Sequence, residues 1–459
     1  MSDHSSPSIA PELLRIEESS RLREYLDEIH PEDISDMLGY AETPQGLKIL
    51  RLLPQSKGAE VLGRVKPELR DNFLEAIPPE ESAVFLSRMS SDDRADFMQE
   101  IAPALAADLL KHLEEIAPEA AEDARRLIAY PEQSAGGLMT TEFIALAPDT
   151  KIKEAIEKVR DFSLRGHAET IYYIYVTAFG NKLVGVLSLR DLILADPENT
   201  LSDIMKQNVV RVEPFADQEE VAQTIARYDL SAIPITGPRG RLIGVVTVDD
   251  VVDVVIEEAT EDAQKMAAIE PIDAAYFETS VATFIRKRAP WLVVLFIGEL
   301  LTATVLKRYE HDFATTLILV AFIPLIISSG GNSGAQSSSL IIRALALGEL
   351  EPKDWWRVFS KELTIGIALG LLLGIVGFAR VFFVPGAAFT AEIALTVAGS
   401  IVAVVLLGAL LGSLLPLGIK RLGLDPAVSS TPFIASLVDV LGLMLYFSIA
   451  RVLIQTVAS

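Results

Sequence analysis

The chain has 459 residues, no cysteine and a formal net charge of −23 at pH 7. Without cysteine, disulfides, thiolate metal sites and cysteine nucleophiles are excluded. All of the acidic excess lies in residues 1–280, which hold 53 Asp and Glu against 27 Lys and Arg, whereas residues 281–459 hold 10 against 13. An acidic surface repels nucleic acid and concentrates cations, and it also keeps a protein soluble.

The N-terminal part of the chain predicts short helices. Residues 1–24 are polar and are expected to be disordered, and residues 1–10 lack the apolar segment of a cleaved signal peptide. Residues 25–130 predict a helical domain in which each helix opens with proline or a polar cap. Four helix starts lie twelve residues apart, at Pro67, Pro79, Ser91 and Pro103. This spacing is typical of a stacked helical superhelix.

Residues 131–250 contain a second repeat, in which strands alternate with helices. Leu138-Met139 corresponds to Ile204-Met205, and residues 185–191 correspond to residues 244–250. The pattern resembles a pair of CBS domains, the tandem regulatory modules named after cystathionine beta-synthase. In that family, positions like Arg190 and Asp191 often contact a nucleotide ribose, which makes both residues candidates for nucleotide binding. The tetrapeptides 188–191 and 247–250 are equally ordinary helix N-caps.

Residues 251–280 are predicted to form an acidic connecting helix, or plug, that leads toward the membrane. The helical pattern itself runs from Asp250 to Ile269. Acids recur along one side at helical spacing: Asp250, Asp253, Glu257 and Glu261, with Glu258 and Asp262 beside them. Only Lys265 opposes them, and like charges at this spacing destabilise an isolated helix. The face either is solvated or binds a divalent cation, and the shortage of basic residues favours the cation.

Five apolar stretches follow the basic residues Arg286, Lys287 and Arg288. A helix needs about 20 apolar residues to cross the hydrocarbon core of a membrane, so the stretches predict five spans. We expect Pro324 and Pro416 to be accommodated as kinks. The stretches are residues 291–306, 313–342, 363–384, 393–419 and 433–457.

The distribution of basic residues predicts the orientation of the spans. Nine lie on one side of the predicted membrane segment and four on the other, and the richer side is expected to be cytoplasmic. Because the number of spans is odd, residues 1–280 would be cytoplasmic and the C-terminus extracytoplasmic. The prediction is therefore a multi-pass protein of the inner (plasma) membrane.

Two polar features interrupt the predicted spans. Residues 330–339 are rich in glycine, serine and amides; such small residues let helices approach closely, whereas Asn332 and Gln336 favour a water-lined path. The last span carries Asp439, and Asp425 lies in the loop before it. A carboxylate at membrane depth is costly and usually faces a cavity or a partner. Glu299 in the first span is the competing acid, with a structural hydrogen-bonding role as its alternative.

Taken in order, these segments resemble the MgtE family of magnesium channels over nearly the whole chain. The most specific motifs are residues 331–337, residues 343–348, Asp425-Pro426 and Asp439. The resemblance implies a homodimer with one pore, lined mainly by the second and fifth spans. It assigns Asp439 of both chains to the pore ion site and Asp425 to its cytoplasmic approach. The pore-lining candidates are Gly331, Asn332, Gly334 and Gln336.

The same resemblance implies carboxylates that sense Mg2+ in the cytoplasmic region. They are Glu60, Asp92, Asp96, Asp217, Glu219, Asp229, Asp250, Asp253, Glu258, Glu261 and Asp262. Two like charges about 4 Å apart repel by about 4 kcal/mol at an effective dielectric near 20. Bound Mg2+ would relieve this repulsion, so high internal Mg2+ is expected to close the pore. Mg2+ and, as a candidate regulator, ATP are the expected ligands.

The sequence thus predicts a multi-domain fold. An all-α superhelical N-terminal domain (25–130) precedes α+β tandem CBS domains (131–250), a long connecting helix (251–280) and a five-helix transmembrane domain (281–459). The expected partners are a second copy of the chain, the lipid bilayer and Mg2+, and no nucleic acid.

The predicted function is a Mg2+-selective channel that imports magnesium and is closed by intracellular Mg2+. Carboxylates reached through water suit Mg2+, although Ca2+, Mn2+ and Co2+ use similar oxygens. A secondary divalent-cation transporter or exchanger shares every motif, and a CBS-based nucleotide-sensing membrane protein is the third function. An enzyme is not expected, because no Ser/His/Asp constellation, Cys/His pair or phosphate loop is present in the sequence.

Overall fold

The computed structural model describes residues 19–458 except 165–170, 273, 278, 314–316 and 384–390. The chain divides into two compact units, Met1–Val255 and Ile256–Ser459. Most of the predicted N-terminal disorder falls on residues 1–18, outside the described residues. Helix α2 begins at Ser19, so helical structure starts before the expected domain boundary at residue 25.

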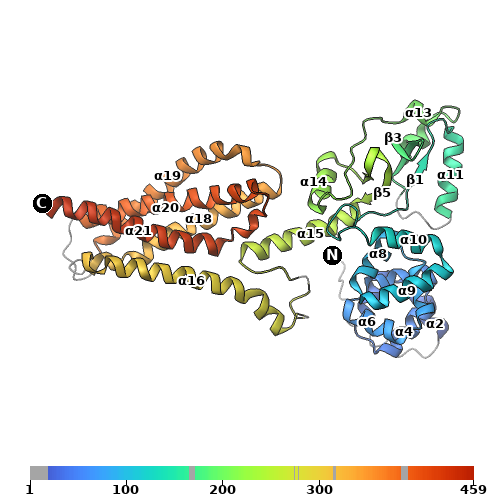
Figure 1. Ribbon diagram of the computed structural model, residues 1–459, viewed down its shortest axis with the longest axis horizontal. Helices are drawn as coiled ribbons and strands as arrows, with labels where there is room; N and C mark the ends of the chain where they lie inside the picture. Colours follow the sequence, from blue (N-terminus) through green and yellow to red (C-terminus); the bar gives the residue numbers. More distant parts are fainter. Residues whose placement is uncertain are drawn as a thin grey trace. The chain divides into compact units, whose positions relative to one another are not determined.

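Nine short helices, counted over the described residues, open the first unit (Figure 1). The four helices predicted from the repeat all begin at the expected residues: α6 (Pro67–Ala76), α7 (Pro79–Leu86), α8 (Ser91–Glu100) and α9 (Pro103–Ile116). Proline suits the first turn because its missing N–H would have no partner there. The others are α2 (Ser19–Glu28), α3 (Pro31–Leu38), α4 (Thr43–Leu52), α5 (Gln55–Arg64) and α10 (Pro118–Leu127).

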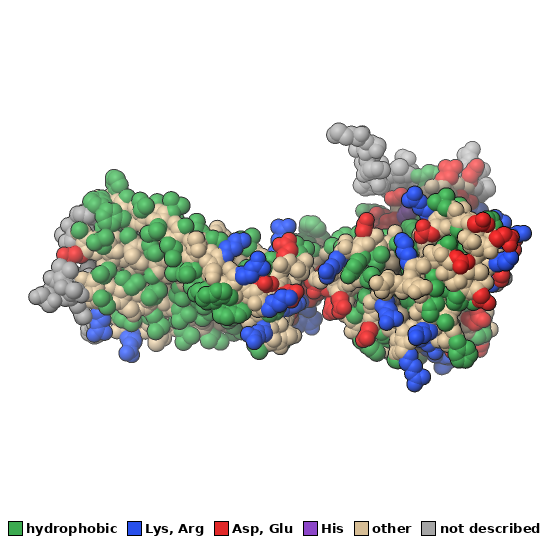
Figure 2. All heavy atoms as spheres, turned by 90° about the horizontal axis from the view of Figure 1, so that it is seen from above, with side chains coloured by type: hydrophobic (Ala, Val, Ile, Leu, Met, Phe, Trp, Pro, Cys, Tyr) green, Lys and Arg blue, Asp and Glu red, His purple; other side chains and the backbone are tan. Residues whose placement is uncertain are grey.

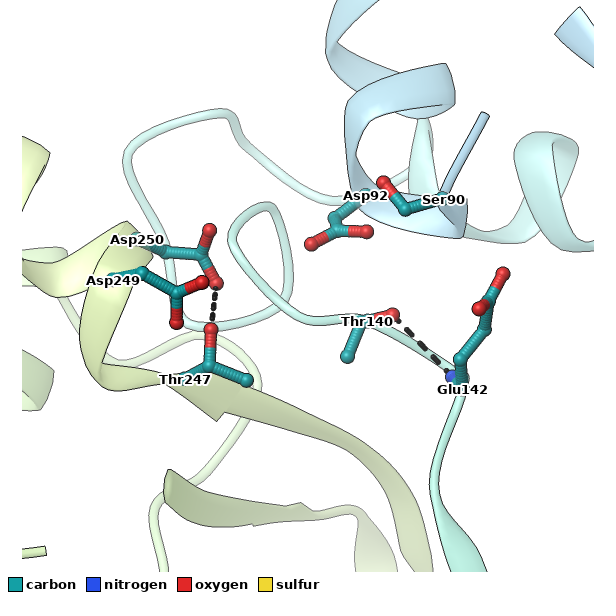
Figure 3. A pocket seen from close by; sticks show the side chains of 7 residues that line it. All are labelled: Ser90, Asp92, Thr140, Glu142, Thr247, Asp249 and Asp250. Atoms are coloured by element: carbon teal, nitrogen blue, oxygen red, sulfur yellow. Dashed lines mark hydrogen bonds between the residues drawn. The ribbon is translucent and has the colours of Figure 1, made fainter. Parts of the chain in front are cut away.

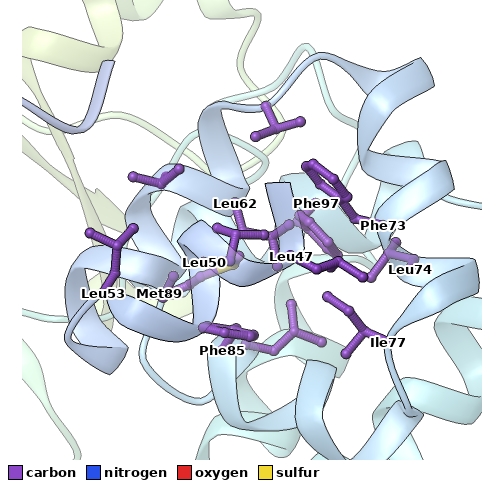
Figure 4. Close-up of a cluster of buried hydrophobic side chains, with 14 of the residues drawn as sticks. Leu47, Leu50, Leu53, Leu62, Phe73, Leu74, Ile77, Phe85, Met89 and Phe97 are labelled. Carbon is purple, nitrogen blue, oxygen red and sulfur yellow. The ribbon is translucent and has the colours of Figure 1, made fainter. Parts of the chain in front are cut away.

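Alternate helices of this group pack on one another. The pairs α3 with α5, α5 with α7, α7 with α9 and α8 with α10 are in contact, which is the predicted stack. Their apolar faces share one core, in which Phe73, Phe85 and Phe97 are buried among leucines (Figure 4). A Cβ on Gly46 would lie 2.5 Å from Cζ of Phe73, so the ring of that residue needs glycine on α4.

Two modules with one hairpin–helix pattern complete the first unit. The first contains β1 (Ile144–Leu146), α11 (Ile152–Leu164), β2 (Tyr173–Ala178), β3 (Lys182–Ser188) and α12 (Leu189–Leu194). The second contains α13 (Leu201–Ile204), α14 (Gln218–Tyr228), β4 (Ala232–Thr236), β5 (Leu242–Thr247) and the start of α15 (Val248–Met266), which continues into the second unit. Strand β2 pairs in parallel with β1 and antiparallel with β3, and β4 pairs antiparallel with β5.

The repeated methionine and glycine of these modules make a reciprocal contact. Met139 packs on Gly244 of the second module, and Met205 packs on Gly185 of the first. A Cβ on Gly244 would lie 2.5 Å from Sδ of Met139, so each methionine requires a glycine opposite. The residues that repeat in the sequence are therefore the ones through which the two modules contact each other.

The connecting helix α15 is shorter than the predicted segment 251–280. It ends at Met266, three residues before the expected Ile269. Ala268 adopts a left-handed conformation with φ of 59°. The Gln264 side chain then accepts a 2.6 Å hydrogen bond from Ile272 N, so the chain folds back on the end of the helix.

Long helices dominate the second unit: α16 (Val281–Phe313), α18 (Ile323–Ala346), α19 (Trp355–Val381), α20 (Ala391–Arg421) and α21 (Thr431–Ala458). Among the described helices, α16, α19, α20 and α21 are long and apolar enough to cross a membrane. Helix α18 has 24 residues and carries the polar segment. Figure 2 shows hydrophobic side chains spread over this part of the surface.

The second predicted stretch is not one continuous helix. A short helix, α17 (Leu317–Val320), is followed by a turn, and α18 begins at Ile323. Pro324 therefore lies in the first turn of α18, where proline costs nothing, and the expected kink at this residue was wrong. Pro416 lies inside α20, within the fourth predicted span, and its kink stays a prediction; Pro290 lies inside α16.

Helix α20 packs on α18, α19 and α21. Glycines make the first of these crossings very close: a Cβ on Gly408 would collide with the carbonyl oxygen of Gly330, and a Cβ on Gly412 with that of Gly334. This is the close approach that small residues permit between membrane helices. This crossing fixes the position of α18 beside α20.

Candidate metal sites

Four carboxylates line one pocket of the first unit (Figure 3). They come from the start of α8, the loop before β1 and the start of α15. The lining residues are Ser90, Asp92, Thr140, Glu142, Thr247, Asp249 and Asp250. Asp92 and Asp250, two of the expected sensing residues, are thus brought together although they lie far apart in the sequence.

Hydroxyl groups hold the segments of this pocket in place. The hydroxyls of Ser91 and Thr140 are 3.0 Å apart, and Thr141 N donates a 2.8 Å hydrogen bond to Ser91 Oγ. Thr247 donates a 2.6 Å hydrogen bond to Oδ2 of Asp250 at the first turn of α15. Within the described structure, the buried Oδ1 of Asp92 has no hydrogen-bond partner. A buried acceptor of this kind fits a site that takes a cation or a water.

Burial makes the charged forms of these acids costly. Burial, with the nearby Asp93, raises the pKa of Asp92, and burial, with Asp92, raises the pKa of Asp250. Asp96 lies on α8 like Asp92, and burial together with the charge of Asp92 raises the pKa of Asp96 to about 8. A divalent cation would favour the ionised form of all three carboxyl groups.

A second acidic group lies in the second unit, where the last turns of α15 meet the loop between α20 and α21. Lys265 Nζ donates a 2.6 Å hydrogen bond to Asp425 Oδ2 and forms an ion pair with Glu261. Burial opposes the charge of Lys265, but these hydrogen bonds outweigh it and raise the pKa of the ammonium group. Burial and then the charge of Asp425 raise the pKa of Asp262 to about 6.

The carboxyl group of Asp439 lies beside Gly331 at the contact between α21 and α18. A Cβ on Gly331 would be 3.8 Å from Asp439 Oδ1. Ser436, one turn before Asp439 on α21, donates a 3.5 Å hydrogen bond to Oε1 of Glu299 on α16. The two competing acids of the sequence therefore belong to one cluster.

The polar segment of α18 has a buried side and an uncovered side. Its serines bond to neighbouring elements: Ser333 to Val405 O, Ser337 to Glu362 and Ser338 to Ser429 O. Gly334 is buried, and a Cβ added to it would lie 3.1 Å from the carbonyl oxygen of Gly408. This glycine therefore serves the packing of α18 on α20. Asn332 and Gln336 are exposed in the single chain.

Comparisons with known proteins agree with this arrangement. A family model described as "Divalent cation transporter" matches residues 323–449, one for the "MgtE intracellular N domain" matches 29–133, and one for the CBS domain matches 135–198 and 201–257. The chain is 39% identical to the "Magnesium transporter MgtE" of Thermus thermophilus over 447 residues, covering 97% of this chain and 98% of that protein. The chain belongs to the MgtE family.

Other MgtE relatives extend this similarity. The magnesium transporter MgtE of Bacillus subtilis is 35% identical, with 72% of each chain covered. A crystal structure of the cytosolic domain of the Mg2+ channel MgtE in complex with ATP is 40% identical, with a TM-score of 0.50, and covers 53% of this chain and 98% of that one. The predicted succession of a helical N-terminal domain, tandem CBS domains and membrane helices is thereby confirmed.

Three of the remaining expected sensing acids of this MgtE chain have local structural roles. Glu60 pairs with Arg64 at 3.5 Å. Asp217 caps α14 by accepting a 2.9 Å hydrogen bond from Glu219 N, and Asp229 ends that helix with φ of 52°. The others are Glu219, Asp253 and Glu258. Within the described ranges, no three His, Asp or Glu side chains gather closely enough to hold a metal ion together, so an ion at the pocket of Asp92 would be held by one or two carboxylates and by water.

One of the two candidate nucleotide residues, Asp191, belongs to a helix cap. Asp191 N donates a 3.1 Å hydrogen bond to Ser188 Oγ, and Ser188 N donates a 3.2 Å hydrogen bond to Asp191 Oδ2. The N-cap alternative is therefore confirmed for this tetrapeptide, and Arg190 between these residues is exposed.

Three acids of these sites escaped the sequence reasoning. Asp249 directly precedes the expected Asp250, so the acidic pair itself was a usable signal. Glu142 lies in a loop without a motif. The third predicted span began at residue 363 and so excluded Glu362 by one position. In the structure Glu362 is buried, with 7% of its surface exposed.

Proposed function

We propose that this protein is a Mg2+ channel of the plasma membrane that imports magnesium as a homodimer. The observation that carries the proposal is the cluster of Asp439, Gly331 and Glu299 where α21 packs on α18 and α16, with Ser436 of α21 bonded to Glu299. Carboxylates at membrane depth suit an ion that keeps most of its water. The relatives named as magnesium transporters, and one named as a Mg2+ channel, support the choice of ion.

The uncovered side of α18 supports a dimeric pore. Asn332 donates a 3.4 Å hydrogen bond to Ser328 Oγ, and both residues are exposed, as is Gln336 one turn further on. Exposed amides on an otherwise apolar unit need water or protein beside them. A second copy facing this stripe would enclose a wet path with Asp439 from both chains near it, and Asp425 would stand at its cytoplasmic approach.

We further propose that intracellular Mg2+ closes the channel through the cytoplasmic acids. The pocket of Asp92, Asp249 and Asp250 supports this, because it joins α8 to the start of α15, and α15 continues into the second unit. Neutralising these carboxylates by a bound cation would hold the pocket together. The N-terminus would then be cytoplasmic and the C-terminus extracytoplasmic, in accord with the basic residues of the loops.

ATP is a candidate regulatory ligand of the tandem CBS domains, supported by the relative whose cytosolic domain was solved with ATP. The cap made by Ser188 and Asp191 leaves Arg190 as the residue free to reach a nucleotide. Equilibrium dialysis of the purified chain with labelled ATP, comparing Arg190→Ala with the wild type, tests this proposal.

Mg2+ uptake into proteoliposomes tests the channel proposal. Asp439→Asn is expected to reduce uptake about tenfold or more, which corresponds to about 1.4 kcal/mol per factor of ten. Glu349→Gln, a change of the same chemistry in an exposed loop, is the matched control. Unchanged uptake by the Asp439 variant would remove the proposal.

Single-channel recording separates the channel from the carrier. Unitary Mg2+ currents from the purified chain in a planar bilayer support a channel. Robust liposome uptake without any unitary current would favour a secondary transporter instead.

A further inference from the structure

We infer that Lys265 is a tethered cation that blocks the cytoplasmic approach to the pore by occupying Asp425. The inference rests on the proposed function, since Asp425 is taken there as part of the ion path. It adds a specific residue that competes with the transported ion for its carboxylate.

The contact leaves Asp425 no unengaged oxygen. Its Oδ2 accepts the 2.6 Å hydrogen bond from Lys265, and its Oδ1 accepts a 2.8 Å hydrogen bond from Ala427 N. The side chains of Lys265 and Asp425 are 25% and 34% exposed, so the pair is partly shielded from solvent. The charge of the ammonium group would repel an incoming cation, so the cation could bind Asp425 well only after the ammonium group leaves.

A second pair of contacts fastens the same end of α15. Thr431, the first residue of α21, donates a 3.0 Å hydrogen bond from Oγ1 to Met266 O. Gln264 holds the chain that follows by accepting from Ile272 N and donating to Ile272 O, at 2.6 and 3.2 Å. The end of the helix is therefore held against the N-terminus of the helix that carries Asp439.

The charges around Lys265 explain why a lysine suits this place. It is the only basic residue among positions 256–266, which include Glu257, Glu258, Glu261 and Asp262. A compact ammonium group with three donors satisfies carboxylate oxygens in the way that a bound cation does. It carries one charge rather than two, so a divalent ion at sufficient concentration competes with it for Asp425.

The sequence separation distinguishes this pair from an ordinary helix pair. Lys265 with Glu261 alone would be a common i,i+4 ion pair of small effect. The bond to Asp425 joins residues 160 positions apart and connects the connecting helix to the loop before α21. Breaking it would therefore change the freedom of α15 at the mouth of the pore.

Crosslinking tests the contact without requiring transport. The chain has no cysteine, so Met266→Cys with Thr431→Cys gives a reporter pair across it. The hydrogen bond from Thr431 is lost in every variant alike, so differences between variants report on Lys265 and Asp425. In the full-length protein, a short bifunctional thiol reagent should crosslink this pair efficiently. Adding Lys265→Met should lower the crosslinking rate about threefold, and Asp425→Asn should do the same. The two changes together should lower it no further than either one alone.

Mg2+ uptake tests the consequence. Lys265→Met should raise initial Mg2+ uptake into Mg2+-free liposomes about threefold. It should also raise, by a similar factor, the internal Mg2+ concentration at which uptake is halved. Lys265→Gln repeats the test if the methionine variant fails to fold. Lys353→Met removes a similar 2.6 Å pair, with Glu351, on exposed side chains and should change neither quantity.

The outcomes separate the two proposals. Wild-type crosslinking rates in both Lys265 and Asp425 variants overturn the inference, and so does lowered crosslinking with unchanged uptake. A wild-type chain that takes up no Mg2+ contradicts the proposed function instead, while the crosslinking result still decides whether Lys265 holds α15 at Asp425.

Discussion

Ser337 of α18 donates a 2.7 Å hydrogen bond to Oε2 of Glu362 in α19, and both side chains are buried. The bond ties the polar helix of the proposed pore to a neighbour on the side away from the exposed Asn332 and Gln336. A buried carboxyl with one hydroxyl partner is a costly arrangement unless it positions something.

Replacing Glu362 should therefore destabilise the membrane unit. Glu362→Ala leaves the Ser337 hydroxyl without its acceptor and should cost about 1–3 kcal/mol, whereas Glu362→Gln keeps an acceptor and should cost less. Thermal unfolding in detergent measures the difference, with Glu349→Ala in an exposed loop as control. If the alanine variant melts with the wild type, Ser337 does not depend on this partner.

The crossing of α18 and α20 should be intolerant of a single methyl group. Gly408→Ala would press a Cβ into the carbonyl oxygen of Gly330, and overpacking of this kind typically costs about 1–3 kcal/mol. Gly399→Ala lies in the same helix with no heavy atom within 4 Å of its Cβ, and it should be tolerated. Thermal unfolding of both variants checks the contrast, and equal melting temperatures would refute it.

Much of this architecture could be predicted from local sequence, because its signals are local. The twelve-residue spacing of Pro67, Pro79 and Ser91 marks helix starts through the chemistry of the first turn. The pocket as a whole could not be found in this way, because Glu142 has no periodic neighbour and Asp92 lies far from Asp250 in the sequence. The bond between Lys265 and Asp425 depends on tertiary contact across 160 positions, and no local pattern specifies such a pair.

The cap at the start of α12 should depend on pH. Hydrogen bonds from the side chain and the backbone of Ser188 lower the pKa of Asp191. Because the pKa is lowered in the folded state, the cap contributes its full stability at pH values above the unfolded-state pKa of about 3.9. This contribution is lost as the pH falls through the folded-state pKa. Asp191→Ala should remove about 1 kcal/mol at neutral pH and nothing at the acid end.

Hydrogen exchange of the peptide covering residues 189–194 measures that loss in the full-length protein. Faster exchange in Asp191→Ala at neutral pH, converging with the wild type in acid, is the expected result. Asp161→Asn on the exposed side of α11 is the control. A difference that persisted unchanged into acid would show that the carboxylate charge does not matter to the cap.

Neutralising Asp250 and adding Mg2+ should each stabilise the pocket of Asp92 and Asp250, because both relieve the same carboxylate repulsion. Burial and mutual repulsion make the charged pair unfavourable, so Asp250→Asn should stabilise the first unit when Mg2+ is absent, while its amide oxygen can still accept the hydrogen bond from Thr247. The wild type should gain stability as Mg2+ is added, by about 2.7 kcal/mol at a hundred times the dissociation constant, and the variant should gain much less. Melting temperatures of the full chain with and without Mg2+ measure both effects, with Asp161→Asn as the matched control. Two results would contradict this account: an Asp250→Asn protein that is less stable than the wild type without Mg2+, or one that Mg2+ stabilises as much as it stabilises the wild type. Either result would mean that the pocket is not stabilised by relief of carboxylate repulsion.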